Sequence, residues 1–370
     1  MNTAYTFQPM MTCIGNKRKL VPEIYNIINT VRQQLNKQSL RIADAFTGSS
    51  VVARALLSLS DILYVNDMEL YSYIMAQCFL QPPSAIQISK ITNHISAMNT
   101  LSINGPYIEG IITRLYAPKN TVNIQPGERC FYTRENALII DTLRKYIEEC
   151  VESDIKQYCL APLLVKASIH TNTAGVFKGF YKCGGIGCFG GKGKNALERI
   201  MAPIRLDVPI WDTDPMITIK SVVCFNGDIL TIIKEWPAVF DIIYLDPPYN
   251  QHPYSSNYFM LNVIATNKEP DNISTVSGIP KQWNKSDFNY IARAVKSMKE
   301  LIQLGLSKSK YLLISYNDEG IISYTEWMKL LQPYTFKQYT IPYNTYRGSR
   351  NLENRSTKIN EIMYLVNLKE

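Results

Sequence analysis

This sequence of 370 residues predicts an α/β fold around a sheet whose central strands are parallel. The apolar run Ile242–Leu245 has the composition of a strand buried on both faces, which is typical of parallel sheets. Strand and helix patterns alternate up to residue 80 and again from residue 220. Residues 81–219 break this alternation, so we expect an insert between the two parts of the sheet.

The first predicted helix runs from Leu20 to Leu35, where apolar residues recur at helical spacing. A basic turn, residues 15–19, precedes it. Cations oppose the helix dipole at this end, so a bound anion would explain the turn. A solvated basic turn is an equally good explanation.

A strand, a glycine loop and a helix follow over residues 41–59, with Asp44 and Gly48 in the loop. Gly48 permits a close backbone approach to a ligand, and the helix start faces that ligand. The next strand ends at Asp67, 23 residues after Asp44 (67 − 44). An acid at this spacing reaches ribose hydroxyls in nucleotide-binding units, although a lone acid after a strand is usually a helix cap. Two acids around one glycine loop favour a cofactor site.

The insert predicts two helices over residues 133–168, followed by a glycine-rich segment at residues 175–194. This segment contains the sequence Gly185-x-Gly187-x-x-Gly190, but no apolar strand leads into it, so we reject a dinucleotide site. Glycines, aromatic residues and lysines interleave here, which suits phosphate contacts, and a flexible solvated loop is the alternative. The lysines concerned are Lys178, Lys182, Lys192 and Lys194.

The sheet resumes with a strand at Ser221–Phe225, and Asp228 follows it, either as a helix cap or as a ligand contact. The central strand must end before Pro247 and Pro248, because neither can donate a ladder hydrogen bond. Asp246 therefore lies at the carboxyl end of that strand, which is where ligands bind in open α/β sheets.

The tetrapeptide from Asp246 to Tyr249 suits a planar amine. An ionised Asp246 only accepts hydrogen bonds, and the carbonyls before the two prolines have no N–H group beside them. Tyr249 adds a flat aromatic face. Acceptors beside a stacking ring fit the exocyclic amine of a nucleobase, and the alternative is an ordinary Pro-Pro turn after a strand.

Three more strands are predicted at Tyr311–Tyr316, Gln338–Tyr343 and Glu361–Leu368. The connection between the last two is basic and aromatic and contains Arg347 and Arg350. It could contact DNA or shape a base pocket, and a plain hairpin loop is equally consistent with it.

The composition narrows the function. The net charge of +8 and the pI near 8.9 fit a polyanionic partner. The eight cysteines include no Cys-x-x-Cys pair and the chain has three histidines, so we expect free thiols and no zinc or other metal site. Neither a signal peptide nor a membrane span is predicted, so we expect a cytoplasmic protein.

The sequence Asp246-Pro247-Pro248-Tyr249 resembles the catalytic motif of S-adenosylmethionine-dependent amino-methyltransferases, especially Dam-like DNA adenine-N6 enzymes. Residues 254–258 also resemble the segment that follows this motif. The order of the basic turn, glycine loop, insert and tetrapeptide is that of the alpha group. The resemblance implies a Rossmann-like seven-stranded mixed sheet, with a catalytic domain at 1–80 and 220–370 and a target-recognition domain at 81–219.

The resemblance also implies roles for individual residues. S-adenosyl-L-methionine would be the cofactor and double-stranded DNA the partner, with the target adenine flipped out of the duplex. Asp246 and the Pro247 carbonyl would accept the amine hydrogens, and Pro248 and Tyr249 would complete the site. DNA contacts would come from the four lysines above and from Arg347 and Arg350. The cofactor contacts would be Gly15, Asn16, Lys17, Asp44, Phe46, Gly48, Ser49, Asp67, Met68, Asp228 and Asp246.

Other activities stay open at this point. Cytosine-N4 methylation, adenine-N6 methylation of RNA and DNA binding without catalysis are the alternatives, and Asp246 favours adenine over cytosine. No Pro-Cys pair occurs, which argues against cytosine-C5 chemistry. We further expect a bacterial, nucleoid-associated monomer in a restriction-modification or related system, with a cognate restriction endonuclease as a possible partner.

Overall fold

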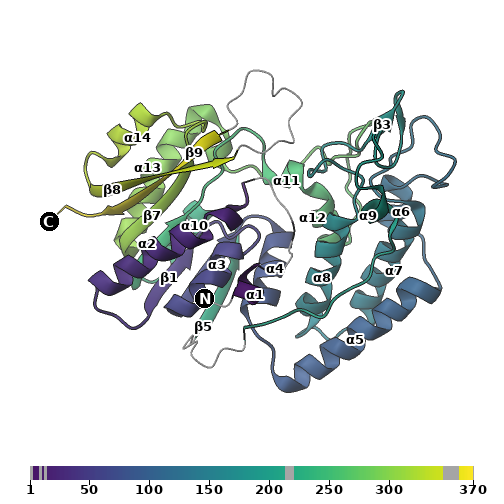
Figure 1. The fold of residues 1–370 in the computed structure, drawn as a ribbon, viewed down its shortest axis with the longest axis horizontal. Coiled ribbons are helices and arrows are strands. Elements are labelled where there is room, and N and C mark those ends of the chain that lie inside the picture. The colour runs from purple at the N-terminus through teal and green to yellow at the C-terminus, as the bar shows by residue number, and fades with distance from the viewer. Residues whose placement is uncertain (1–2, 8–10, 12–14, 213–220, 345–357, 370) are drawn as a thin grey trace.

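The computed structural model describes residues 3–7, 11, 15–212, 221–344 and 358–369. Within this part of the chain, a seven-stranded mixed sheet has the strand order β5-β2-β1-β6-β7-β9-β8 (Figure 1). The predicted Rossmann-like mixed sheet is therefore confirmed. Its strands are β1 (Leu40–Asp44), β2 (Ser60–Asp67), β5 (Ser221–Asn226), β6 (Phe240–Leu245), β7 (Ser309–Asn317), β8 (Thr335–Asn344) and β9 (Lys358–Asn367).

The central strand β6 is buried along its whole length, as its apolar sequence predicts. It pairs in parallel with β1 and β7, and β1 pairs in parallel with β2. Asp44 lies beside Tyr244 in the register, so the segments after β1 and β6 leave the sheet at the same edge. Within this sheet, β9 pairs antiparallel with β7 on one side and with β8 on the other.

Successive side chains of β6 point to opposite faces of the sheet. Ile242 and Tyr244 join one hydrophobic core, and Ile243 and Leu245 join the other. The first core includes residues of α2 (Val21–Gln34), α3 (Val51–Leu56) and α4 (Leu70–Leu80). The second includes residues of α10 (Ile229–Glu235), α13 (Ile291–Lys308) and α14 (Tyr324–Leu331). The sheet is thus covered by helices on both faces.

The insert forms the other half of the molecule (Figure 1). The two helices predicted over residues 133–168 are present as α7 and α8. Residues of the insert belong to the same hydrophobic core as one face of the sheet, so one core spans both parts. The insert elements are α5 (Ala85–Asn104), α6 (Ile111–Tyr116), α7 (Arg134–Cys150), α8 (Lys156–Ile169), β3 (Lys182–Cys183), β4 (Ile186–Gly187) and α9 (Leu197–Met201).

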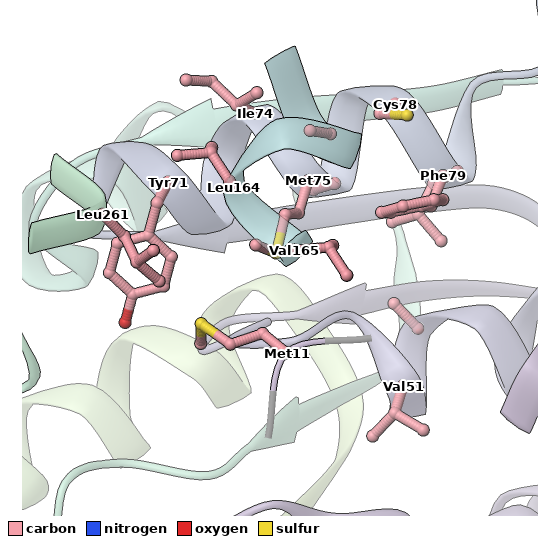
Figure 2. Close-up of a cluster of buried hydrophobic side chains, with 14 of the residues drawn as sticks. Met11, Val51, Tyr71, Ile74, Met75, Cys78, Phe79, Leu164, Val165 and Leu261 are labelled. Carbon is pink, nitrogen blue, oxygen red and sulfur yellow. The ribbon is translucent and has the colours of Figure 1, made fainter. Parts of the chain in front are cut away.

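Helix α4 joins the two halves because it is apolar on most of its surface. Figure 2 shows Met75 of α4 close to Leu164 and Val165 of α8, and α4 also contacts α12 (Phe259–Thr266). Met11 and Val51 of α3 belong to the same cluster of buried side chains (Figure 2). Side chains of the sheet half and of the insert therefore pack around α4.

The glycine-rich segment contains the short antiparallel hairpin β3–β4. Its strands do not lead into a helix, which agrees with rejecting a dinucleotide site. A disulfide joins Cys183 and Cys188 across the hairpin, so the expectation of free thiols is wrong for this pair. The turn between the two cysteines brings them together. They are five residues apart, so a search for Cys-x-x-Cys pairs does not find them. Among the described helices, none has the length and apolarity required to cross a membrane.

Candidate active site

A pocket opens where β1, β2 and β6 end. The loops after these strands are tied together by backbone hydrogen bonds, from Ala45 N to Tyr244 O at 3.0 Å and from Thr47 N to Asn66 O at 2.9 Å. All residues predicted to contact the cofactor line this one pocket, from Gly15, Asn16 and Lys17 through the β1 and β2 loops to Asp228 and Asp246. Pro248 also lines it, whereas Pro247 and Tyr249 do not.

The glycine loop is shaped by two residues in the left-handed region, Gly48 with φ 52° and Ser50 with φ 62°. Gly48 N donates to Asp67 Oδ2 at 2.7 Å, and Glu69 N donates to the other oxygen at 2.8 Å. Asp67 is therefore held by the backbone on both sides while it lines the pocket. Burial raises the pKa of Asp67 to about 6, and these two hydrogen bonds limit the rise.

Asp44 is almost fully buried and lines the same pocket. Phe46 N donates to its Oδ1 at 3.3 Å. Burial raises the pKa of Asp44 well above its usual value, and the nearby carboxylate of Asp246 raises it further. A cationic group in the pocket would relieve both effects.

Asp228 caps a helix, which is one of the two roles that the sequence left open, and its position leaves the other role possible as a prediction. Its Oδ1 accepts a hydrogen bond from Leu230 N at 2.9 Å, which caps α10, and the residue also lines the pocket. Glu69, which the sequence did not single out, lines the pocket beside Asp67. Burial, followed by the charge of Asp67, raises the pKa of Glu69 to about 8.

Lys17 lies at the centre of a buried ion cluster. Its Nζ is 2.9 Å from Asp246 Oδ1 and 3.0 Å from Glu361 Oε1, and the Lys17 side chain is 5% exposed. Burial lowers the pKa of Lys17, but the carboxylates of Asp246 and Glu361 outweigh this and hold it well above its usual value. For Asp246, burial raises the pKa to about 6, with Lys17 lowering it and Glu361 raising it. The sequence predicted neither partner of Lys17.

Gly15 brings the N-terminal turn against the tetrapeptide. Its φ is 76°, and a Cβ atom added there would lie 2.8 Å from Tyr254 Oη and 3.0 Å from Tyr249 Oη. Tyr249 also packs edge-on against the ring of Tyr316, with centroids 6.3 Å apart. The positive φ favours glycine here, and an added Cβ atom would require the two tyrosine hydroxyl groups to shift.

Residues after the tetrapeptide complete the rim of the pocket. Asn289 Nδ2 donates to Asn250 O at 2.8 Å, and Ser255 Oγ donates to Asn284 O. Asn284 and Asn289 line the pocket together with Ser286. The sequence offered no signal for this rim, because single polar residues in a loop have no characteristic spacing.

The four lysines of the glycine-rich segment are all exposed. Phe177 N donates to Asn257 O at 2.7 Å, so this segment lies beside the residues that follow the tetrapeptide. Burial lowers the pKa of His252, and the charge of Lys178 lowers it further, which places Lys178 near the same region. Arg347 and Arg350 lie outside the described residues.

Comparisons with known proteins identify the family of the chain. A family model described as D12 class N6 adenine-specific DNA methyltransferase matches residues 14–330. The chain is 30% identical to the type II methyltransferase M.CviAII of Paramecium bursaria Chlorella virus 1, over 87% of each chain. It is 25% identical to the type II methyltransferase M.NlaIII of Neisseria lactamica, over 97% of this chain and 99% of that protein.

It is also 28% identical to the modification methylase StsI of Streptococcus sanguinis, over 97% of this chain but 52% of that protein. A solved structure from Thermoplasma acidophilum aligns over 96% of this chain and 99% of its own, with a TM-score of 0.34 and 6% identity, which is too low to carry an argument. Of the activities left open by the sequence, the family match selects adenine methylation of DNA. The chain belongs to the D12 class of N6 adenine-specific DNA methyltransferases.

Proposed function

We propose that this chain uses S-adenosylmethionine to methylate adenine N6 at a specific site in double-stranded DNA, with Asp246 at the reaction centre. The observation that carries the proposal is the convergence of Asp44, Asp67, Asp228 and Asp246 on one pocket at the carboxyl edge of the sheet. The family match supports the reaction. The pocket lies at the carboxyl ends of the strands, which is where ligands bind in open α/β sheets.

The described residues fit the cofactor. Asp44 is a buried carboxylate that lacks a cationic partner among the contacts described above, so an ammonium group in the pocket would compensate it. Asp67 is fixed by two backbone donors and can still accept hydrogen bonds from ribose hydroxyls. Asp228 lines the pocket beside Ile229, where a planar base would meet both a carboxylate and an apolar surface. When bound, S-adenosylmethionine supplies an electrophilic methyl group.

We assign Asp246 the role of acceptor for the target amine. The base must leave the duplex to reach this pocket, as in other enzymes that modify a base. Lys17 occupies Oδ1 of Asp246, so the second oxygen can accept a hydrogen bond from the amine. An acceptor here favours the pyramidal nitrogen needed for attack over the planar ground state. The nitrogen loses one proton as it gains the methyl group, and we assign Asp246 the role of receiving that proton.

The insert at residues 81–219 is proposed to contact DNA through its glycine-rich segment. Four exposed lysines lie there, and the segment borders the residues after the tetrapeptide. Phosphate contacts from such lysines would place the duplex over the pocket. We also propose the division of the chain into a catalytic domain and a recognition domain. This is a division of roles, because the two halves share one hydrophobic core.

We also propose that the protein acts as a monomer and that a cognate restriction endonuclease accompanies it. The names of the relatives, type II methyltransferase and modification methylase, support a modification role. Methylation of the host's own sites would then protect its DNA inside a bacterial cell.

Methylation-sensitive sequencing of DNA from cells that express the protein tests the proposed function. We expect N6-methyladenine within one short recurring sequence, and none in cells that express Asp246→Ala. Methylated cytosine in place of adenine, or an unchanged mark with Asp246→Ala, would contradict the proposal.

A further inference from the structure

The last strand of the sheet contributes an acid to the reaction centre. Glu361 lies on β9 opposite Asn317 at the end of β7, and its side chain is completely buried. Its Oε1 is 3.0 Å from Lys17 Nζ and accepts a hydrogen bond from Ser315 Oγ. The same Lys17 nitrogen reaches Asp246 Oδ1 at 2.9 Å. One ammonium group therefore joins two carboxylates from β9 and from the end of β6.

A purely structural role explains this cluster poorly. Removing an ammonium group and two carboxylates from water costs free energy that apolar side chains of similar volume would not cost. The second oxygen of Glu361 is buried and has no hydrogen-bond partner among the described residues, which adds to that cost. Such an arrangement is typical of functional sites, where charges serve chemistry rather than stability.

We propose that Glu361 is a positioning residue for methyl transfer, because it holds the Lys17 ammonium group against one oxygen of Asp246 and so turns the other toward the target amine. The inference rests on the role proposed above for Asp246. Without Glu361, Lys17 loses one of its two carboxylate partners, and the Asp246 carboxylate loses its fixed orientation. The expected consequence is a slower chemical step with DNA and cofactor binding retained.

Among the described residues, four charged or titratable groups interact electrostatically with Asp246, and each comes from a different element. Lys17 belongs to the turn before α2, Glu361 to β9, Asp44 to β1 and Tyr244 to β6. Lys17 lowers the pKa of Asp246, whereas Glu361 raises it. Removing the negative charge of Glu361 should therefore let Asp246 ionise at lower pH, which a residue with only a packing role would not do.

The test is the pH dependence of single-turnover methylation by the full-length Glu361→Gln variant. We expect the acid limb of the profile to move down by roughly one pH unit, because a like charge has been removed. On the plateau, the rate should fall by about tenfold to a hundredfold through loss of orientation. Affinities for DNA and cofactor should stay at their wild-type values.

Asp241→Asn is the matched control. Asp241 is a buried acid on the same strand as Tyr244, but it pairs with Lys37 at the opposite end of β6. Asp241→Asn removes one negative charge, as Glu361→Gln does. We expect it to leave the acid limb of the pH profile at its wild-type position. A wild-type limb and rate in a folded Glu361→Gln variant would overturn the inference, as would an equal shift in Asp241→Asn.

Lys17→Met keeps the inference testable if Glu361→Gln does not fold. This variant removes the cation that lowers the pKa of Asp246, so the acid limb should move up, and an unmoved limb would count against the cluster. Asp246→Asn separates this inference from the proposed function. Activity in Asp246→Asn would refute the assigned reaction centre, whereas an inactive Asp246→Asn with an unaltered Glu361→Gln would refute only the role of Glu361.

Discussion

Asp44 and Asp67 line the same pocket but are held differently. Asp67 accepts backbone hydrogen bonds on both oxygens, whereas Asp44 accepts one from Phe46 and is buried beside the charge of Asp246. An added cation would therefore benefit Asp44, and added hydroxyl donors would benefit Asp67.

Both acids are expected to contribute to cofactor binding. Asp44→Ala and Asp67→Ala should each weaken S-adenosylmethionine binding by about 1.5–3 kcal/mol, which is typical for a hydrogen bond to a charged group. Titration calorimetry measures the change, and the exposed Asp207→Ala in the insert serves as a control. Unchanged affinity in both pocket variants would mean that this pocket does not hold the cofactor.

Tyr249 is proposed to contribute its ring rather than its hydroxyl group. Tyr249→Phe should retain most activity, and Tyr249→Ala should weaken capture of the flipped base by roughly 1–3 kcal/mol through loss of stacking. A fluorescent adenine analogue at the target position reports flipping separately from methyl transfer. Equal inactivity of the two variants would show that the hydroxyl group, which approaches Gly15, is required.

At the scale of elements, the glycine-rich segment is anchored rather than freely solvated. Asn172 accepts from Gly190 N at 2.9 Å and donates to Cys130 O at 2.8 Å, while the disulfide closes the β3–β4 hairpin. Deleting this segment would remove packing as well as charge. Substituting its lysines is the cleaner test of a phosphate-binding role.

Replacing Lys178, Lys182, Lys192 and Lys194 with Gln should weaken DNA binding and flatten its salt dependence. Each lost phosphate contact should reduce the slope of log K against log salt by about 0.9. The control replaces four exposed lysines on α10, α13 and α14, which are Lys234, Lys296, Lys299 and Lys329. Equal slopes in both quadruple variants would show that the glycine-rich segment makes no specific phosphate contacts.

At the scale of the whole molecule, the shared core couples the insert to the sheet. Leu164 of α8 is fully buried and lies close to Met75 of α4 in Figure 2. Helix α4 in turn contacts β2 and β5 of the sheet. Loosening the insert should therefore loosen the sheet half as well.

Leu164→Ala tests this coupling. A cavity at a buried leucine typically costs about 2–5 kcal/mol. Because both halves share one core, we expect one cooperative unfolding transition at a lower midpoint, with calorimetric and spectroscopic probes in agreement. Two separate transitions, with the cofactor-stabilised one unmoved, would show that the halves fold independently.

The sequence was enough to predict the family, the order of the motifs along the chain and the acids that line the pocket. Each of these depends on short stretches of sequence. An apolar run that ends in Asp-Pro-Pro shows where a strand stops, and acids after neighbouring parallel strands must meet at one edge. The disulfide was not predictable, because it depends on how tightly the β3–β4 turn closes. The role of each predicted site residue remains a prediction.

Only the tertiary structure decided which groups surround Asp246. Lys17 and Glu361 come from opposite ends of the chain, and no periodicity or spacing relates them. They meet because β9 returns antiparallel to β7 while the N-terminal turn folds over the end of β6. Likewise, the shared core around α4 follows from packing between distant helices. Local patterns determine where elements begin and end, whereas side chains far apart in sequence become neighbours only through the packing of those elements.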